Sequence, residues 1–169
     1  MSHLNIEIKA KCSDQGKIRR ILRSKKALFK GTDHQIDTYF RVSRGRLKLR
    51  EGNIENNLIF YERENKKGPK RSDVVFYRVA PKSNLKELLL KVFDVLKIVD
   101  KKREIYFIEN VKFHLDTVKE LGTFVEIEAI DETGKIGKKK LREQCNYYVK
   151  LFEIKEKDLL TNSYSDLVK

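Results

Sequence analysis

The sequence predicts an α+β fold in which an eight-stranded antiparallel β-barrel is flanked by α-helices. Polar and apolar residues alternate with a period of two along most of the chain, as is typical of strands with one polar face. Three stretches interrupt this alternation with the spacing of amphipathic helices. The chain has 169 residues, of which 40% are hydrophobic, and we expect one compact domain over residues 1–169.

The strands are expected to pair mostly as sequential hairpins. Leu4 to Ala10 alternates apolar and polar residues, and Gly45 can adopt the positive φ angle that a tight turn after Val42 requires. Eight strands are enough for a barrel that closes around a small ligand. The expected strands span residues 4–10, 35–42, 46–50, 58–64, 73–79, 99–109, 111–117 and 123–131.

Three helices are expected outside the barrel. Residues 13–14 offer N-caps for the first, whose apolar residues recur at helical spacing through Leu22. Asn84 and Glu87 resemble a capping box that opens the second helix, which extends to about Leu96. The third covers residues 137–152. We expect the apolar stripes of all three to pack in the core.

The polar faces of the expected strands carry charges of both signs. A solvated outer face is one interpretation, but the apolar faces would then fill the barrel and leave the helices no sheet to pack on. We therefore expect the charged faces to point inward and to line a hydrated tunnel. Those charged residues are Glu7, Lys9, Lys48, Arg50, Arg63, Arg78, Lys101, Arg103, Asp116, Glu126 and Glu128.

Such a tunnel suits a particular chemistry. Converging lysines and arginines supply the donors and positive charge that hold a triphosphate. Carboxylates among these cations can bind a hard divalent ion such as Mg²⁺ or Mn²⁺. Glu126 and Glu128 lie on one strand face about 7 Å apart, two strand rises, a separation that can flank a metal.

The composition of the chain indicates which binding partners and which cellular compartment to expect. The net charge of +13 indicates an anionic partner, namely nucleic acid, an acidic membrane or a polyphosphate. Cys12 and Cys145 have no metal-binding spacing, and a reducing cytoplasm is the expected compartment. No apolar run approaches the ~18 residues of a membrane span, so we expect no membrane partner.

Several segments, in order, resemble the CYTH family of triphosphate tunnel metalloenzymes. Asn5 to Lys9 resembles the ExExK motif that opens these proteins, and the stretch from His114 to Glu128 is similar to the closing segment of class IV adenylyl cyclases. Further similar segments span residues 37–40, 47–52, 101–107 and 163–167. The resemblance covers nearly the whole chain and implies an eight-stranded tunnel, a bound triphosphate and catalysis that depends on Mg²⁺ or Mn²⁺.

The resemblance also implies roles for individual residues. The metal positions are matched by Glu7, Asp116, Glu126 and Glu128, and Asp116, Glu126, Glu128 and Lys9 are implied to be catalytic. The substrate-binding positions are matched by Lys9, Lys48, Arg50, Arg63, Arg78, Lys101, Arg103 and Tyr39. One position departs from the pattern, because Asn5 replaces the first acidic residue of ExExK. Asn5 weakens the case for a second metal, since it carries no negative charge.

Three functions remain open at this level. The first is a class IV adenylyl cyclase that converts ATP to cyclic AMP and pyrophosphate, and the second is a triphosphatase acting on inorganic, nucleoside or thiamine triphosphate. The third is a non-enzymatic binder of RNA or polyphosphate, which the sequence disfavours because its lysine runs lack interleaved aromatic residues. A homodimer is also left open. His114 and His34 are assigned no catalytic role.

Overall fold

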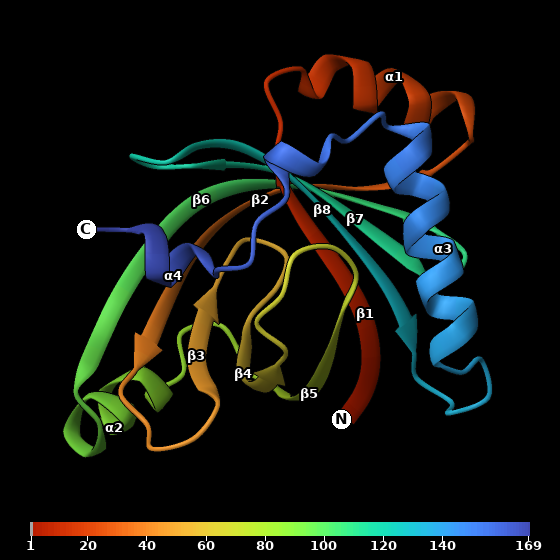
Figure 1. The fold of residues 1–169 in the computed structure, drawn as a ribbon. Helices are drawn as coiled ribbons and strands as arrows, with labels where there is room; N and C mark the ends of the chain where they lie inside the picture. Colours follow the sequence, from red (N-terminus) through yellow and green to blue (C-terminus); the bar gives the residue numbers. More distant parts are fainter. Residues whose placement is uncertain (1) are drawn as a thin grey trace.

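A computed structural model describes residues 2–169 and shows the expected closed antiparallel barrel, with strand order β1-β5-β4-β3-β2-β6-β7-β8 and β8 pairing with β1 (Figure 1). The strands are β1 (Ser2–Lys11), β2 (Leu28–Phe40), β3 (Arg46–Glu51), β4 (Asn57–Arg63), β5 (Lys70–Arg78), β6 (Val95–Ile108), β7 (Val111–Val118) and β8 (Gly122–Asp131). The helices are α1 (Gln15–Ser24), α2 (Leu85–Val92), α3 (Lys138–Leu151) and α4 (Tyr164–Leu167), with a 3₁₀ turn at Glu156–Asp158.

The largest differences from the predicted boundaries lie at β2, the second helix and β6, and α4 was not among the three expected helices. β2 begins at Leu28, seven residues before the expected start at Gln35, because it pairs with β6 from Leu28 onward. The second helix ends at Val92, since Phe93 is extended and β6 begins at Val95. The expected capping box is also not formed: the Asn84 side chain makes no cap hydrogen bond, although its carbonyl accepts from the Leu88 amide.

α1 and α3 cover the apolar outer face of one side of the barrel, as predicted. α1 and α3 lie beside β1, β7 and β8 (Figure 1). Ile6, Phe113 and Ile127, one from each of these strands, are fully buried in a core that also contains Leu22 of α1 and Leu141 of α3. The main core of the described chain therefore lies outside the barrel wall, and this leaves the barrel interior to polar residues.

The expected packing of the second helix, α2, is wrong. Only Leu89 of α2 is buried, and Leu88, Val92 and Leu96 of its predicted stripe are 58%, 64% and 43% exposed.

The chain after α3 runs back across one end of the barrel. The Leu160 amide donates to the Lys9 carbonyl, and the buried Lys70 ammonium donates to the carbonyls of Leu160 and Thr161. Arg46 binds both carboxylate oxygens of Asp166 in α4. This C-terminal segment (residues 159–168) closes the barrel end that Lys9 faces.

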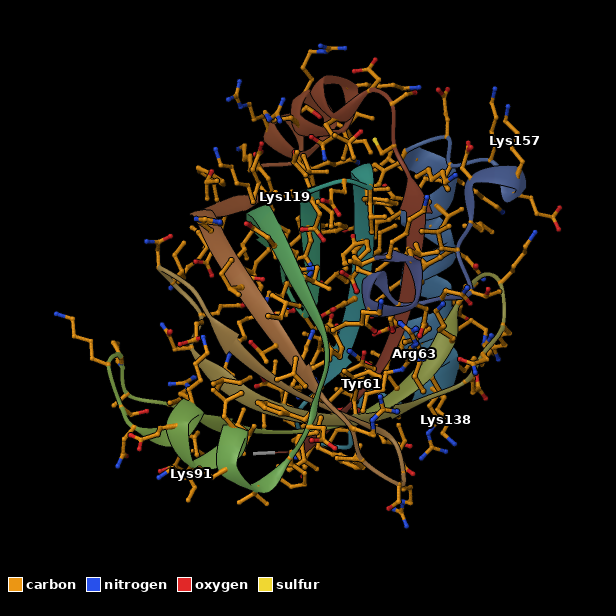
Figure 2. The ribbon with its side chains drawn as sticks, turned by 90° about the vertical axis from the view of Figure 1, so that its left-hand side faces the viewer. Tyr61, Arg63, Lys91, Lys119, Lys138 and Lys157 are labelled. Atoms are coloured by element: carbon orange, nitrogen blue, oxygen red, sulfur yellow. The ribbon has the colours of Figure 1, made fainter. Side chains whose placement is uncertain are left out.

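Many of the basic residues lie outside the barrel. In Figure 2 the side chains of Lys91 and Lys157 extend into solvent at the periphery, whereas Tyr61 and Arg63 lie beside the C-terminal segment. Within residues 2–169, no helix combines the length and the apolar character that crossing a membrane requires.

We predict that Phe113→Ala lowers the free energy of unfolding by about 3–5 kcal/mol, the usual cost of truncating a core phenylalanine. Phe113 is fully buried, with its ring centroid 4.6 Å from that of Tyr148 and 5.7 Å from that of Phe152. Phe107→Ala is the control, because Phe107 is only partly buried and faces the barrel cavity. Urea denaturation measures both, and a larger loss for Phe107→Ala would contradict an outer core.

Candidate active site

The barrel encloses a cavity of about 630 Å³, within the usual range for small-molecule sites. The predicted site residues that line it come from seven strands. They are Glu7, Lys9, Tyr39, Lys48, Arg50, Arg63, Arg78, Lys101, Arg103, Glu126 and Glu128. The inward direction of the charged strand faces is therefore confirmed, although Arg78 is itself exposed.

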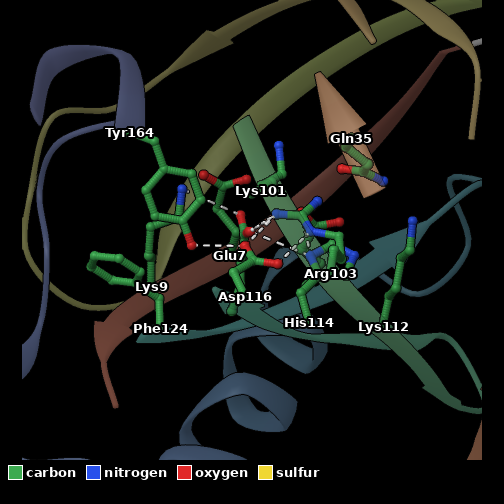
Figure 3. Close-up of polar contacts among 12 residues, drawn as sticks. Glu7, Lys9, Gln35, Lys101, Arg103, Lys112, His114, Asp116, Phe124 and Tyr164 are labelled. Atoms are coloured by element: carbon green, nitrogen blue, oxygen red, sulfur yellow. Dashed lines mark hydrogen bonds and ion pairs between the residues drawn. The ribbon is translucent and has the colours of Figure 1, made fainter. Parts of the chain in front are cut away.

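Asp116 is placed differently from the sequence expectation. Its carboxylate is fully buried and accepts two hydrogen bonds of 2.7 Å from Arg103 and one of 2.7 Å from the Tyr164 hydroxyl (Figure 3). It is not among the residues that line the cavity in the described chain. Burial opposes its ionisation, but Arg103 outweighs burial and lowers the pKa of Asp116. In this structure Asp116 therefore holds Arg103 in position, and its metal-binding and catalytic roles stay predictions.

Arg103 links this buried carboxylate to the cavity. The same Nη2 that binds Asp116 also donates to Glu126 at 2.9 Å. Lys9 lies 3.8 Å from the opposite oxygen of Glu126, and its ammonium sits 3.8 Å from the centre of the Tyr164 ring. Two predicted phosphate-binding cations and one predicted metal carboxylate thus meet at the closed end of the barrel.

Asp37 holds a second group of cations, and the sequence analysis missed its role. Its fully buried carboxylate accepts from Lys48 at 3.0 Å, from Lys101 at 2.7 Å and from Arg50 at 2.9 Å through both oxygens. Burial opposes its ionisation, yet the three cations hold the pKa of Asp37 well below its ordinary value. Its place on the same strand face as Tyr39 was the signal that could have found it.

A loop carboxylate, Glu55, and the β7 residue Lys112 were also missed. Both line the cavity and form an ion pair, and Glu55 accepts a second bond of 2.9 Å from Arg50. Buried Asp33 fixes the loop, because it accepts from the amides of Ile54 and Glu55 at 2.9 Å each. No periodic pattern could place Glu55, since it lies between strands.

Arg63 connects the first strand to the C-terminal segment. It donates to Glu7 at 2.9 Å and to the Ser163 hydroxyl at 3.0 Å, while its buried Nε has no partner within residues 2–169.

Burial lowers the pKa of Lys9 and, more strongly, that of Lys101. Both ammonium groups are thus poorly solvated cations that an anion would stabilise.

His114 joins Glu126 and Glu128 in one compact group. Its Nδ1 lies 3.3 Å from Glu126 and 3.9 Å from Glu128, and ligand atoms of all three residues lie within 4.8 Å of one another. Burial and then Arg103 lower the pKa of His114 to about 3, so its ring is neutral at pH 7. Burial and then Glu126 raise the pKa of Glu128 to about 8. Sequence reasoning set His114 aside, although its two-residue offset from Asp116 placed it on the same face.

This group fits a divalent cation. Two carboxylates and a neutral imidazole are ordinary ligands, and a cation would relieve the repulsion that raises the pKa of Glu128. The Oδ1 of Asn5 and the Nε2 of His114 are buried without a partner in the described chain. Both side chains line the same cavity, as does Glu7, which is paired in register with Glu128.

Most of the apolar lining lies toward the other end of the cavity, where Arg78 and Glu132 also line it. Along β6, Lys101 and Arg103 are followed on the inner face by Ile105 and Phe107, and on β8 the two glutamates are followed by Ile130. The further apolar side chains in this lining are Ile54, Ile59, Val74, Phe76, Val79 and Pro81. The site therefore combines a charged compartment with an apolar one.

We predict that Asp37→Asn destabilises the protein by about 3–5 kcal/mol, because three cations lose their buried counter-charge. Asp73→Asn is the control, since Asp73 is exposed and pairs with Arg71 at the surface. Urea denaturation at pH 7 compares them. The ionised carboxylate stabilises the fold above its unfolded pKa of 3.8, so the difference from wild type should shrink as pH falls below that value. Equal effects of the two substitutions would contradict this account.

Comparisons with known proteins agree with this architecture. The model of the CYTH domain matches residues 3–164. The chain is 26% identical over 179 aligned positions to "Putative adenylate cyclase MJ0240" of Methanocaldococcus jannaschii, covering 97% of this chain and 98% of the relative. It is similar to the solved structure of PH1012 from Pyrococcus horikoshii OT3, with a TM-score of 0.83, 25% identity, and coverage of 98% and 99% of the two chains.

A more distant structure shares the fold. The solved structure of "Putative adenylyl cyclase HpAC1" from Hippeastrum, a protein with a dominant triphosphatase activity, matches with a TM-score of 0.63 at 13% identity. The alignment covers 95% of this chain and 91% of that one. Since the family model spans almost the whole described chain, and the barrel has the charged interior that the sequence predicted, the protein belongs to the CYTH domain family.

Proposed function

We propose that this protein is a metal-dependent enzyme acting on a triphosphate, and that its reaction is the conversion of ATP to cyclic AMP and pyrophosphate. The observation that carries the proposal is the convergence, in one cavity, of basic side chains with the group formed by His114, Glu126 and Glu128. A family relative named as an adenylate cyclase supports the choice of reaction.

The basic residues are suited to hold the β- and γ-phosphates. Arg50 and Arg103 are fixed by Asp37 and Asp116, so their guanidinium planes are positioned before a ligand arrives. Lys101 and Lys9 add positive charge. Both side chains are buried, so water solvates their ammonium groups poorly. Positive charge held at this place would also neutralise the pyrophosphate that leaves.

The apolar compartment favours a nucleotide over inorganic triphosphate. Phe107 and Ile130, which are only partly buried, offer surface that a base and ribose can cover, whereas inorganic triphosphate would leave this surface without contacts. The two compartments adjoin along β6 and β8, so one extended ligand can occupy both.

In the proposed reaction the ribose 3′-hydroxyl oxygen attacks the α-phosphorus, the bond from that phosphorus to the bridging oxygen breaks, and pyrophosphate departs. The nucleophile belongs to the substrate, so the chain's main task is to hold the two reacting atoms together. A bound cation would keep Glu128 ionised, because it offsets the burial and the repulsion from Glu126 that otherwise raise the pKa of Glu128, and the ionised carboxylate is our candidate to receive the hydroxyl proton. A Mg²⁺ or Mn²⁺ ion held by Glu126 and Glu128, with Glu7 nearby, would supply charge that polarises the α-phosphate.

Triphosphate hydrolysis is the second candidate function. The activity described for HpAC1, which shares this fold, supports it. Hydrolysis needs an activated water in place of the tethered hydroxyl, and a second cation is the usual means of activation. Asn5 disfavours that second cation because its amide brings no negative charge.

The test is incubation of the protein with ATP and either Mn²⁺ or Mg²⁺, with chromatographic separation of cyclic AMP, ADP and AMP. We expect cyclic AMP and pyrophosphate in equal amounts, and weak competition by inorganic triphosphate. ADP and phosphate without cyclic AMP would overturn the cyclase proposal in favour of hydrolysis. No metal-dependent product from ATP, other nucleoside triphosphates, thiamine triphosphate or inorganic triphosphate would overturn both.

We predict that Glu126→Gln and Glu128→Gln each abolish metal-dependent turnover, because each removes a charged ligand from the proposed cation group. The Glu128→Gln protein should be as stable as wild type or slightly more stable, since it relieves the repulsion with Glu126. Glu143→Gln, on the exposed face of α3, is the control for loss of a carboxylate. Wild-type turnover in both site variants would remove them from the catalytic group.

Asn5→Glu separates the two reactions. In a cyclase that relies on one cation, the substitution should change cyclic AMP formation by less than about tenfold and should raise phosphate release, because a second cation can then activate water. Parallel measurement of cyclic AMP and phosphate for both proteins decides this. Unchanged phosphate release would contradict the role we give to Asn5.

A further inference from the structure

We propose that His114 is a cation ligand, and that the site it forms with Glu126 and Glu128 binds Mn²⁺ in preference to Mg²⁺. The proposal rests on the metal dependence proposed above and names the kind of ion. Its basis is the position of one imidazole, for which the sequence suggested no role in catalysis.

The strand pairing brings these three side chains to one place. β7 and β8 are antiparallel neighbours in which His114 is directly opposite Glu126. Glu128 lies two residues further along the same face, so its carboxylate also reaches the imidazole, at 3.9 Å from Nδ1. Cross-strand neighbours on one sheet face are held by backbone pairing, and the group is therefore preformed.

The hydrogen bonding of His114 differs from that of a histidine with a purely structural role. Its side chain is almost fully buried, yet its Nε2 has no partner among residues 2–169 and its Nδ1 contact with Glu126 is long, at 3.3 Å. By comparison, the exposed His34 binds Asp100 at 2.7 Å. Buried polar atoms are nearly always paired, so the unpaired nitrogen of His114 indicates a missing partner.

Within the described chain, the unpartnered atoms of other residues that line this cavity are the Nε of Arg63, the Oγ of Ser72 and the Oδ1 of Asn5. The Oδ1 of Asn5 is buried on the inner face of β1, two residues before Glu7, and Glu7 is in register with Glu128. An amide oxygen is a common ligand for a divalent ion or for a water that the ion holds. Asn5 therefore offers a further oxygen ligand from the same inner face as Glu7.

The type of ligand determines which ion is favoured. Mg²⁺ prefers oxygen ligands in a strict octahedron and retains its waters, whereas imidazole nitrogen is a good ligand for first-row transition ions. A site with two carboxylates and one imidazole should therefore discriminate in favour of Mn²⁺. A site made of Glu7, Glu126 and Glu128 alone would have oxygen ligands only and no such bias.

The experiment uses Mn²⁺ as the probe and electron paramagnetic resonance as the readout, so that turnover is not required. Pulsed spectra of the Mn²⁺-loaded protein should contain the coupling of a directly bound imidazole nitrogen. Labelling the wild-type protein with ¹⁵N-histidine should change that coupling, and this measurement needs no variant. His3→Ala and His34→Ala should both keep the coupling, because His3 lies at the apolar end and His34 lies outside the cavity lining.

The variant that tests the assignment is His114→Asn, whose amide can keep the contact with Glu126 but cannot reach as far as the imidazole. We expect it to lose the nitrogen coupling and to lower the ratio of Mn²⁺ to Mg²⁺ affinity by about tenfold or more. Bound Mn²⁺ without histidine coupling in the wild-type protein would overturn this inference and leave the proposed function standing. If wild type binds no Mn²⁺, with or without a non-hydrolysable ATP analogue, both proposals fail.

Discussion

The structure depends on two buried carboxylates that hold the cations of the barrel interior in place. Asp37 pairs with Lys48, Arg50 and Lys101, while Asp116 pairs with Arg103. Without these partners, four cations would face one another in a space that water solvates poorly. The same pairs fix the directions of the guanidinium groups. The ion pairs that offset the repulsion among the buried cations therefore also orient the proposed phosphate site.

The apolar residues that stabilise the fold and the residues proposed to bind substrate lie in different parts of the molecule. The largest apolar core lies between the barrel wall and the helices α1 and α3, while the ionisable groups of the candidate site line the cavity inside the barrel. One strand therefore serves both purposes: β7 presents Phe113 to the outer core and His114 to the cavity.

The sequence predicted the features that depend on periodicity and missed those that depend on pairing across strands. Alternation identified the barrel, the inward charges and most of the charged residues that line the cavity, because a period of two fixes the face of each side chain. It could not show that Arg103 covers Asp116, that Asp37 anchors three cations, or that the loop residue Glu55 reaches the cavity. The end of the second helix was also misplaced, because Phe93 to Leu96 continue its apolar pattern while entering β6.

The central claim is that the charged interior is a triphosphate site with an adjoining cation group. A crystal structure of the protein with a non-hydrolysable ATP analogue and Mn²⁺ tests it most directly, with anomalous scattering to locate the ion. We predict phosphates within hydrogen-bond distance of Arg50 and Arg103, the base beside Phe107, and the manganese peak next to Glu126 and Glu128. An analogue bound on the outer surface of the barrel, with the cavity cations still paired only to carboxylates, would contradict the account.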